Sequence, residues 1–189
     1  MSLESDVAGV LRHETVGRIS FTIESIAVNK VEMESVAKAI DSLDISVVVA
    51  STGNSLGAAY SSFVTRRWDA GEKKLIGRIT LGSTGVAGSG VGRAGIFHEC
   101  VHALKDVQGV KGPMYKISMH NEEVVAYLAD AMYLRATKTS VAGDAKAMAI
   151  YKAAFAIVDG RKMLSKHRVT LKWTDCGALR DAIKAHPAY

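Results

Sequence analysis

The sequence predicts an α+β fold in which a small mixed sheet from the N-terminal half packs on a helical C-terminal half. Two observations predict this class. Alternating or β-branched apolar segments dominate the first half, whereas apolar residues recur at helical spacing through most of the second. Strands followed by helices, instead of alternating with them, argue against a doubly wound sheet. At 189 residues the chain fits one domain, 1–189, with a proper hydrophobic core.

The first half supplies the expected strands. Residues 18–28 alternate apolar and polar side chains, which is typical of a half-buried strand, and residues 31–43 have helical spacing. The β-branched run at 45–50 suits a buried strand. The segments expected next are a loop or mixed segment (51–62), a short strand (63–68), a turn (69–71) and a further strand (Lys73–Leu81).

Glycines and helix signals organise the rest of the chain. Six glycines between Gly82 and Gly95 predict a flexible or tightly turning loop. A helix is then expected from about Ile96 to Gln108, with Gly109 as its C-cap. The later helices are expected at about 121–137, at about 144–158, which is apolar on most faces and therefore expected to be buried, and at about 174–185.

Composition narrows the class of protein. With 48% apolar and 23% charged residues, the chain is expected to be globular. The net charge is +5, but the basic residues are scattered and aromatics are too few to stack bases, so no specific nucleic-acid partner is expected. No signal peptide or membrane-spanning run is visible, so we expect no membrane association. The expected location is cytoplasmic, or outside after export by a signal-independent secretion system; the oligomeric state stays open.

Chemistry concentrates in His98-Glu99-Cys100-Val101-His102, an H-E-x-x-H motif within an expected helix. Four residues of helix bring His98 and His102 to within about 40° of each other on one face, where two imidazoles can hold one zinc ion. Glu99 then lies beside the metal and can take a proton from bound water, the chemistry of a zinc hydrolase. Cys100 should face away from the metal into packing.

A hydrolytic zinc site needs three protein ligands and a fourth position that stays open for water. The extended three-histidine motif is absent, because Lys105 and Gln108 stand where it needs glycine and histidine. Asp106 lies one turn beyond His102, but three ligands along one straight helix would spread over about 12 Å, too far for one ion. The helix expected at about 121–137 supplies better metal-ligand candidates, the adjacent residues Glu122 and Glu123. Adjacent helical residues are 100° apart, so only one of the two can point at the metal.

Residues His98 to Asp130 resemble the gluzincins, zinc peptidases that combine H-E-x-x-H with a glutamate on a later helix. Glu122 and Glu123 follow His102 by twenty or twenty-one residues, within that family's common range. Glu123-Val124-Val125-Ala126 matches its E-x-x-A context, and Asn121-Glu122 resembles the N-E pair of thermolysin-like members. The resemblance implies Glu123 as third ligand, with Glu122 as the fallback. Compact bacterial metallopeptidases, including toxin and effector domains, look similar.

The resemblance implies a zincin-like fold, one Zn²⁺ and a peptide or protein substrate. Zinc held by His98, His102 and Glu123 would activate water, and Glu99 would serve as general base and then protonate the leaving amine. The strand Lys73–Leu81 is expected to form the sheet edge that pairs with an extended peptide.

Supporting roles in such a site are less determined. Asp130 and Asp106 are candidate acceptors for the other ring nitrogens of the histidines. An oxyanion needs a hydrogen-bond donor, and the sequence does not choose among several residues that can donate. These candidate donors are Tyr115, His120, Tyr127, His167 and Arg168.

The sequence also allows a nucleotide-binding and a non-catalytic interpretation. Residues 90–95 match G-x-G-x-x-G, but the preceding strand should end near Leu81 and no acidic residue stands about twenty positions on, so a dinucleotide site is not expected. The glycine segment fits a flap or a plain connection beside the active helix. The alternative function is a non-catalytic partner-binding protein whose zinc is structural or absent.

Overall fold

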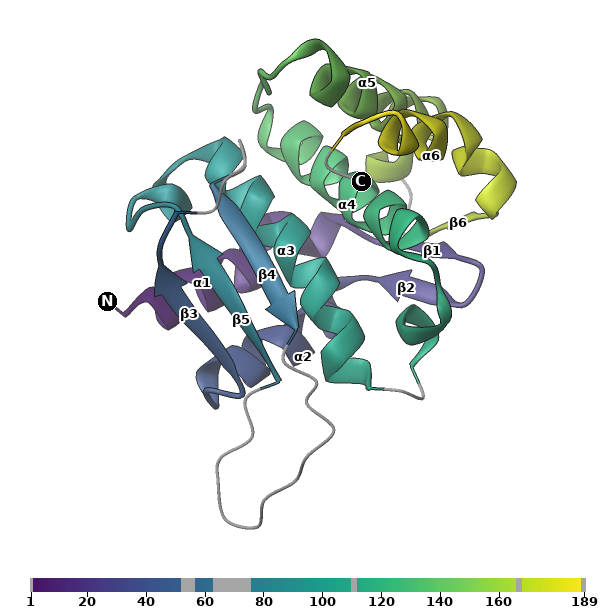
Figure 1. Ribbon diagram of the computed structural model, residues 1–189. Helices are drawn as coiled ribbons and strands as arrows, with labels where there is room; N and C mark the ends of the chain where they lie inside the picture. The colour runs from purple at the N-terminus through teal and green to yellow at the C-terminus, as the bar shows by residue number, and fades with distance from the viewer. Residues whose placement is uncertain (1, 52–56, 63–75, 110–111, 166–167, 188–189) are drawn as a thin grey trace.

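The computed structural model describes residues 2–51, 57–62, 76–109, 112–165 and 168–187, apart from the side chain of Tyr115 (Figure 1). The helices are α1 (Leu3–Arg12), α2 (Lys30–Asp41), α3 (Gly90–Gln108), α4 (Met119–Thr137), α5 (Ala145–Gly160) and α6 (Gly177–Lys184). The strands are β1 (Phe21–Ile23), β2 (Ile26–Val28), β3 (Ile45–Val49), β4 (Ala58–Ser62), β5 (Gly77–Leu81) and β6 (Val169–Leu171). The expected α+β class is confirmed.

The sheet beside the H-E-x-x-H helix has the strand order β3-β5-β4, with β5 parallel to β3 and antiparallel to β4. Because β5 is paired on both sides, the expectation that Lys73–Leu81 forms a substrate-pairing edge is wrong. Its described part, residues 76–81, contains the central strand β5 (Gly77–Leu81). The edge position next to α3 belongs to β4, which lies in the segment 51–62 whose Ser, Gly and Asn residues predicted a loop or mixed structure. The expected strand at 63–68 and turn at 69–71 lie outside the described residues.

The second sheet has the order β2-β1-β6 and also corrects an expectation. Residues 18–28 do not form one strand, because the chain reverses at Glu24, whose φ is +52°, and pairs Ile23 with Ile26. The alternation of apolar and polar residues breaks at Glu24-Ser25, and this pair of consecutive polar residues is the turn between β1 and β2. β6, which the sequence did not predict, pairs in parallel with β1 and ties the C-terminal region to the first half.

Helix α3 begins at Gly90 instead of about Ile96, so the second half of the glycine segment is helix and not loop. The Ser89 side chain accepts a hydrogen bond from the Gly92 N–H at 2.9 Å and caps the helix. A methyl group at Gly92 would come within 2.0 Å of the Val86 carbonyl oxygen, so glycine permits a close backbone approach. The helix ends at Gly109, as expected.

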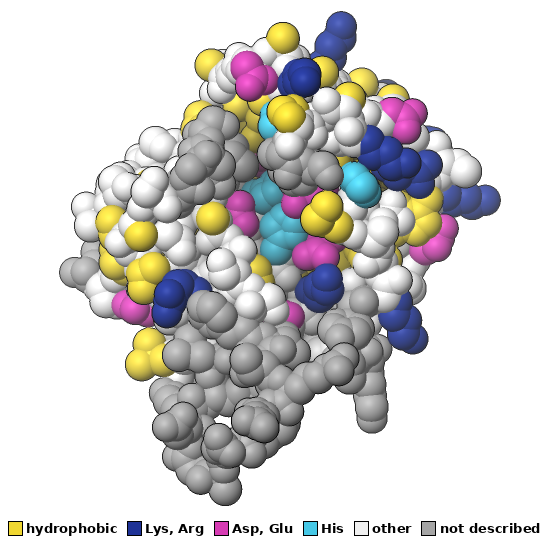
Figure 2. Space-filling model, in the orientation of Figure 1, with side chains coloured by type: hydrophobic (Ala, Val, Ile, Leu, Met, Phe, Trp, Pro, Cys, Tyr) yellow, Lys and Arg dark blue, Asp and Glu magenta, His cyan; other side chains and the backbone are white. Residues whose placement is uncertain are grey.

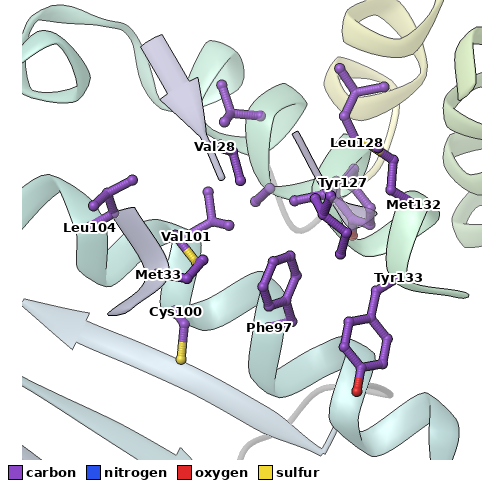
Figure 3. Close-up of a cluster of buried hydrophobic side chains, with 14 of the residues drawn as sticks. Val28, Met33, Phe97, Cys100, Val101, Leu104, Tyr127, Leu128, Met132 and Tyr133 are labelled. Carbon is purple, nitrogen blue, oxygen red and sulfur yellow. The ribbon is translucent and has the colours of Figure 1, made fainter. Parts of the chain in front are cut away.

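Helices α3 and α4 form the centre of the core. The segment Glu123–Leu134 of α4 is buried without interruption, and α3 packs against α1, α2, α4, β4 and β5. Figure 3 shows Phe97 and Cys100 of α3 among apolar side chains, with the Phe97 and Tyr133 rings 5.5 Å apart. Cys100 is fully buried there, which confirms the expected packing role.

The C-terminal helices lie on the outside of α4 (Figure 1). The α5 helix follows its Asp144 N-cap as expected, but it buries only Ile150, Tyr151, Ala154 and Val158, so the expectation of a buried helix is wrong. The α5 sequence is apolar on most faces because it is rich in alanine, yet alanine has little side chain to bury. The α6 helix begins at Gly177, after a short 3₁₀ turn. Among the described helices, none combines the length and hydrophobicity needed to cross a membrane.

Candidate metal centre

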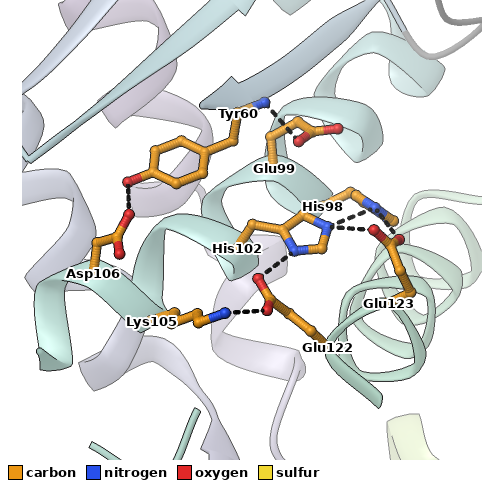
Figure 4. Close-up of polar contacts among 8 residues, drawn as sticks. All are labelled: Tyr60, His98, Glu99, His102, Lys105, Asp106, Glu122 and Glu123. Atoms are coloured by element: carbon orange, nitrogen blue, oxygen red, sulfur yellow. Dashed lines mark hydrogen bonds and ion pairs between the residues drawn. The ribbon is translucent and has the colours of Figure 1, made fainter. Parts of the chain in front are cut away.

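His98, His102 and Glu123 meet where α3 and α4 pack together (Figure 4). The two Nε2 atoms are 3.2 Å apart, and each lies 3.4 Å from one carboxylate oxygen of Glu123. Around a tetrahedral zinc ion with bonds of about 2.0 Å, neighbouring ligand atoms are about 3.3 Å apart. These three side chains could therefore hold one metal ion without large movement, as the sequence predicted.

Local helix geometry produces this convergence. His98 and His102 occupy successive turns of one face of α3. The Ser118 side chain caps α4 by accepting from the Asn121 N–H, and Glu122 and Glu123 follow in the first turns. His98 is only 2% exposed and Glu123 only 8%. The packing around these two side chains therefore fixes their orientation.

Glu122 does not join the metal-binding group. It lies on the other side of His102, where the ring Nδ1 donates to its Oε1 at 2.9 Å. Lys105 donates to the second oxygen of Glu122 at 2.7 Å. Histidine ligands are usually oriented by such an acceptor on the nitrogen that does not face the metal. Glu122 thus occupies the supporting role for which the sequence suggested Asp130 or Asp106, and Glu123 is the glutamate that groups with the two histidines.

The charges of this cluster are strongly coupled. Burial lowers the pKa of His102, but hydrogen bonds to Glu122 and Glu123 outweigh burial and raise that pKa to about 10. Burial works against ionisation of Glu123, yet its contacts with His102 and His98 hold its pKa well below the ordinary value. The pKa of Glu122 is also lowered, despite burial, by His102 and Lys105. A proton on His102 therefore sits where a cation would bind.

His98 also contacts Tyr127 of α4, which in turn packs against Tyr151 of α5. The Tyr127 ring meets the His98 ring edge-on with centroids 4.6 Å apart. Tyr151 donates to Asp130 Oδ2 at 2.7 Å, and burial raises the pKa of Asp130 to about 6. The buried Asp130 Oδ1 and His98 Nδ1 have no hydrogen-bond partner among the described residues. Asp130 therefore stays a candidate acceptor for His98.

Glu99 accepts a hydrogen bond at Oε2 from the Tyr60 N–H, 2.8 Å away, and is 7% exposed. In Figure 4 it lies across the histidine pair from Glu122. The Tyr60 hydroxyl donates to Asp106 at 2.6 Å. The suggestion that Asp106 supports a ligand histidine is therefore wrong, because its carboxylate faces Tyr60. Burial, followed by the bond to Asp106, raises the pKa of the Tyr60 phenol, which keeps it protonated as a donor.

The structure places the other candidate oxyanion donors of the sequence analysis differently. Arg168 donates to Thr22 and links β6 to β1, and His120 is half-buried at the start of α4. Tyr127 is the one with a contact to a ligand histidine in the described part of the chain. His167 and the Tyr115 side chain lie outside the described residues.

Three residues of the site were not predicted from the sequence. They are Tyr60, Lys105 and Tyr151. Lys105 stands one helical turn beyond His102 on the same face, so that spacing was a usable signal. Tyr60 and Tyr151 reach the site from other elements, and no local pattern indicates them.

Histidine and acidic side chains are visible together at the centre of the face drawn in Figure 2. His102 is partly exposed, with 13% of its side chain accessible. The cluster is therefore reached from solvent on this face, although most of each ligand is buried.

No known family model matches the chain, and neither curated proteins nor solved structures show a significant match to it. Functional inference therefore rests on the chemistry of these side chains.

Proposed function

We propose that this chain is a zinc-dependent peptidase with a gluzincin-like site on a zincin-like fold. One observation carries the proposal: two imidazole nitrogens and a carboxylate converge at ligand spacing, with Glu99 next to them on the same helix. This donor set suits zinc, and three protein ligands leave a position open, as in catalytic sites and unlike closed structural cages.

The residues of the chain have distinct roles in the proposed reaction. Bound zinc would polarise the substrate carbonyl and lower the pKa of a coordinated water. Glu99 accepts the proton of the attacking water while the water oxygen bonds to the carbonyl carbon. Glu99 then delivers that proton to the amide nitrogen as the carbon–nitrogen bond breaks, so the products are a carboxylic acid and an amine. Glu122 keeps Nε2 of His102 aimed at the ligand position.

The proposed substrate is an extended peptide or protein segment lying beside β4. This strand runs next to α3 and, among the described strands, pairs with β5 alone. An extended peptide can add to such an edge by main-chain hydrogen bonds, at positions other than the Tyr60 N–H that donates to Glu99. This role replaces the one expected for Lys73–Leu81. The zincin-like assignment is an analogy of arrangement: a small sheet with an edge strand, a metal-binding helix and a second helix that supplies the glutamate.

Metal content and cleavage test the proposal with three isosteric variants. Purified protein should carry one zinc per chain by elemental mass spectrometry and cleave members of a proteome-derived peptide library. Glu99→Gln should retain zinc and lose cleavage at least about 100-fold, the scale of a lost general base. Glu123→Gln should lose zinc and cleavage together. Glu14→Gln, at an exposed position outside the metal-binding group, controls for loss of one negative charge.

The outcomes separate this proposal from the alternative. Equal cleavage by wild type and Glu99→Gln would reject Glu99 as the base. A chain that neither binds zinc nor responds to added zinc would favour a partner-binding protein without metal. Stoichiometric zinc without any cleavage would favour a non-catalytic zinc protein.

A further inference from the structure

Tyr60 connects strand β4 to helix α3 at two points. Its backbone N–H donates to Glu99, and its side-chain hydroxyl donates to Asp106. Glu99 and Asp106 are seven residues apart, which is about two turns, so both lie on the same face of the helix. One residue of the edge strand therefore spans two turns of the helix that carries the H-E-x-x-H motif (Figure 4).

The path of the Tyr60 side chain depends on Gly77 of the neighbouring strand. A Cβ atom built on Gly77 would come within 2.0 Å of the Tyr60 hydroxyl and 2.5 Å of the ring carbon that carries it. Glycine at the start of β5 leaves the space that the phenol fills on its way to Asp106. The Tyr60 side chain of β4 thus depends on Gly77 of β5 for space and on Asp106 of α3 for its hydrogen bond.

The two hydrogen bonds differ in what they fix. A phenol bonded to a carboxylate is charge-assisted and stronger than a neutral pair, so it anchors the ring. The bond from the Tyr60 N–H engages one oxygen of Glu99, as Figure 4 shows, and a carboxylate offers further acceptor sites on its other oxygen. Glu99 is thereby held in one orientation while retaining an oxygen that can take a proton.

We propose that Tyr60 is a positioning residue for Glu99, and that Asp106 and Gly77 hold Tyr60 in place. The phenol fixes how β4 lies on α3, and the amide of the same residue fixes the carboxylate of Glu99. The catalytic consequence rests on the proposed peptidase function, whereas the link between Tyr60 and Glu99 does not. The two can therefore be tested separately.

Amide hydrogen exchange, measured by NMR, tests the link without a substrate. In Glu99→Ala the amide of Tyr60 should exchange at least about tenfold faster, because opening a hydrogen-bonded amide limits its exchange. Tyr60→Phe removes only the hydroxyl and should also speed exchange at position 60. Tyr133→Phe is the matched control, because it removes a buried hydroxyl with no hydrogen-bond partner among the described residues. Unchanged exchange at position 60 in Tyr60→Phe would overturn the proposal.

Cleavage kinetics test the consequence, using the peptide that zinc-loaded wild type cleaves best from the library. Misplacing a general base affects the chemical step, so Tyr60→Phe and Asp106→Ala should lower kcat about tenfold and change KM by less than about twofold. Asp106→Asn keeps an acceptor for the phenol and should recover most of the loss. A raised KM with unchanged kcat would contradict positioning. If wild type cleaves nothing, the peptidase proposal fails, while the exchange rates still decide whether Tyr60 holds Glu99.

Discussion

Glu122 accepts a hydrogen bond from Nδ1 of His102 at 2.9 Å, on the side of the ring that faces away from Glu123. A carboxylate can only accept, so this contact places a proton on Nδ1 and directs Nε2 toward Glu123. Adjacent residues of α4 therefore contact one imidazole from two sides. Lys105 donates to Glu122 and balances its charge.

Glu122→Gln should weaken zinc binding by about 10- to 100-fold without removing a ligand, as is typical when the group behind a metal-binding histidine is replaced. Glutamine keeps the shape and one acceptor atom but loses the charge that favours the imidazole donor. Competition against a chromophoric chelator measures the change, with Glu14→Gln as the control for net charge. An affinity equal to that of wild type would show that Glu122 does not support His102.

Zinc binding should release about one proton from His102 near neutral pH, because the pKa of about 10 in the metal-free protein means that this ring is protonated there. Affinity should then rise by about tenfold per pH unit between about pH 7 and 9. Titration calorimetry in two buffers of different ionisation enthalpy counts the released protons. A binding enthalpy independent of the buffer would contradict the assignment.

The metal-free protein should also show the sign of these couplings in its stability. The folded pKa of His102 exceeds the ordinary 6.5, so its stabilising contribution is complete below pH 6.5 and lost as pH rises through about 10. The lowered pKa values of Glu122 and Glu123 act oppositely, giving stability above pH 4.5 that is lost on acidification. The increase in Tm on adding zinc should therefore grow as pH rises above 6.5. Thermal unfolding with zinc or with chelator checks this, and Glu123→Gln should show little increase.

Much of the metal-binding group was predictable because it depends on local spacing. Helical periodicity alone places His98 and His102 on one face, and it requires that only one of Glu122 and Glu123 point at the metal. Choosing between the two glutamates needed the family resemblance, and the structure groups Glu123 with the histidines. Local spacing could not show that the other glutamate would bind the far side of His102, because that depends on how α4 packs against α3.

The expectations that were wrong for β4 and for the start of α3, and the missed role of Tyr60, have a different physical cause. Strand β4 is short and rich in small residues, so its edge position comes from pairing with β5 and contact with α3, not from its own pattern. Tyr60 was missed with it, because a backbone N–H donor leaves no mark in the sequence. The sequence did not predict the early start of α3, because glycines such as Gly90 and Gly92 usually indicate a loop. In the structure, Gly92 lies in the helix because only glycine leaves room for the backbone oxygen of Val86.

The hydroxyls of Tyr151 and Tyr133 should contribute oppositely to stability. Tyr151 donates to the fully buried Asp130, so Tyr151→Phe should reduce the free energy of unfolding by about 1–3 kcal/mol, the cost of leaving a buried acceptor with less compensation. The Tyr133 hydroxyl has no partner among the described residues, so Tyr133→Phe should be neutral or slightly stabilising. Urea unfolding of the two variants gives the comparison. Equal losses would indicate that packing, and not the bond to Asp130, accounts for the effect.

Adding one methyl group at either of two helical glycines should also change stability in opposite directions. Gly92→Ala places a Cβ within 2.0 Å of the backbone oxygen of Val86, which cannot swing away as a side chain can, so about 1–3 kcal/mol should be lost. Gly9, inside α1, has nothing within 4 Å of an added Cβ, and Gly9→Ala should gain about 0.5–1 kcal/mol from helix propensity. Urea unfolding measures both changes. Because Gly92 lies in the turn that begins α3, Gly92→Ala should also weaken zinc binding, whereas Gly9→Ala should leave it unchanged. A stable Gly92→Ala protein with wild-type affinity would mean that the start of α3 can shift without moving His98.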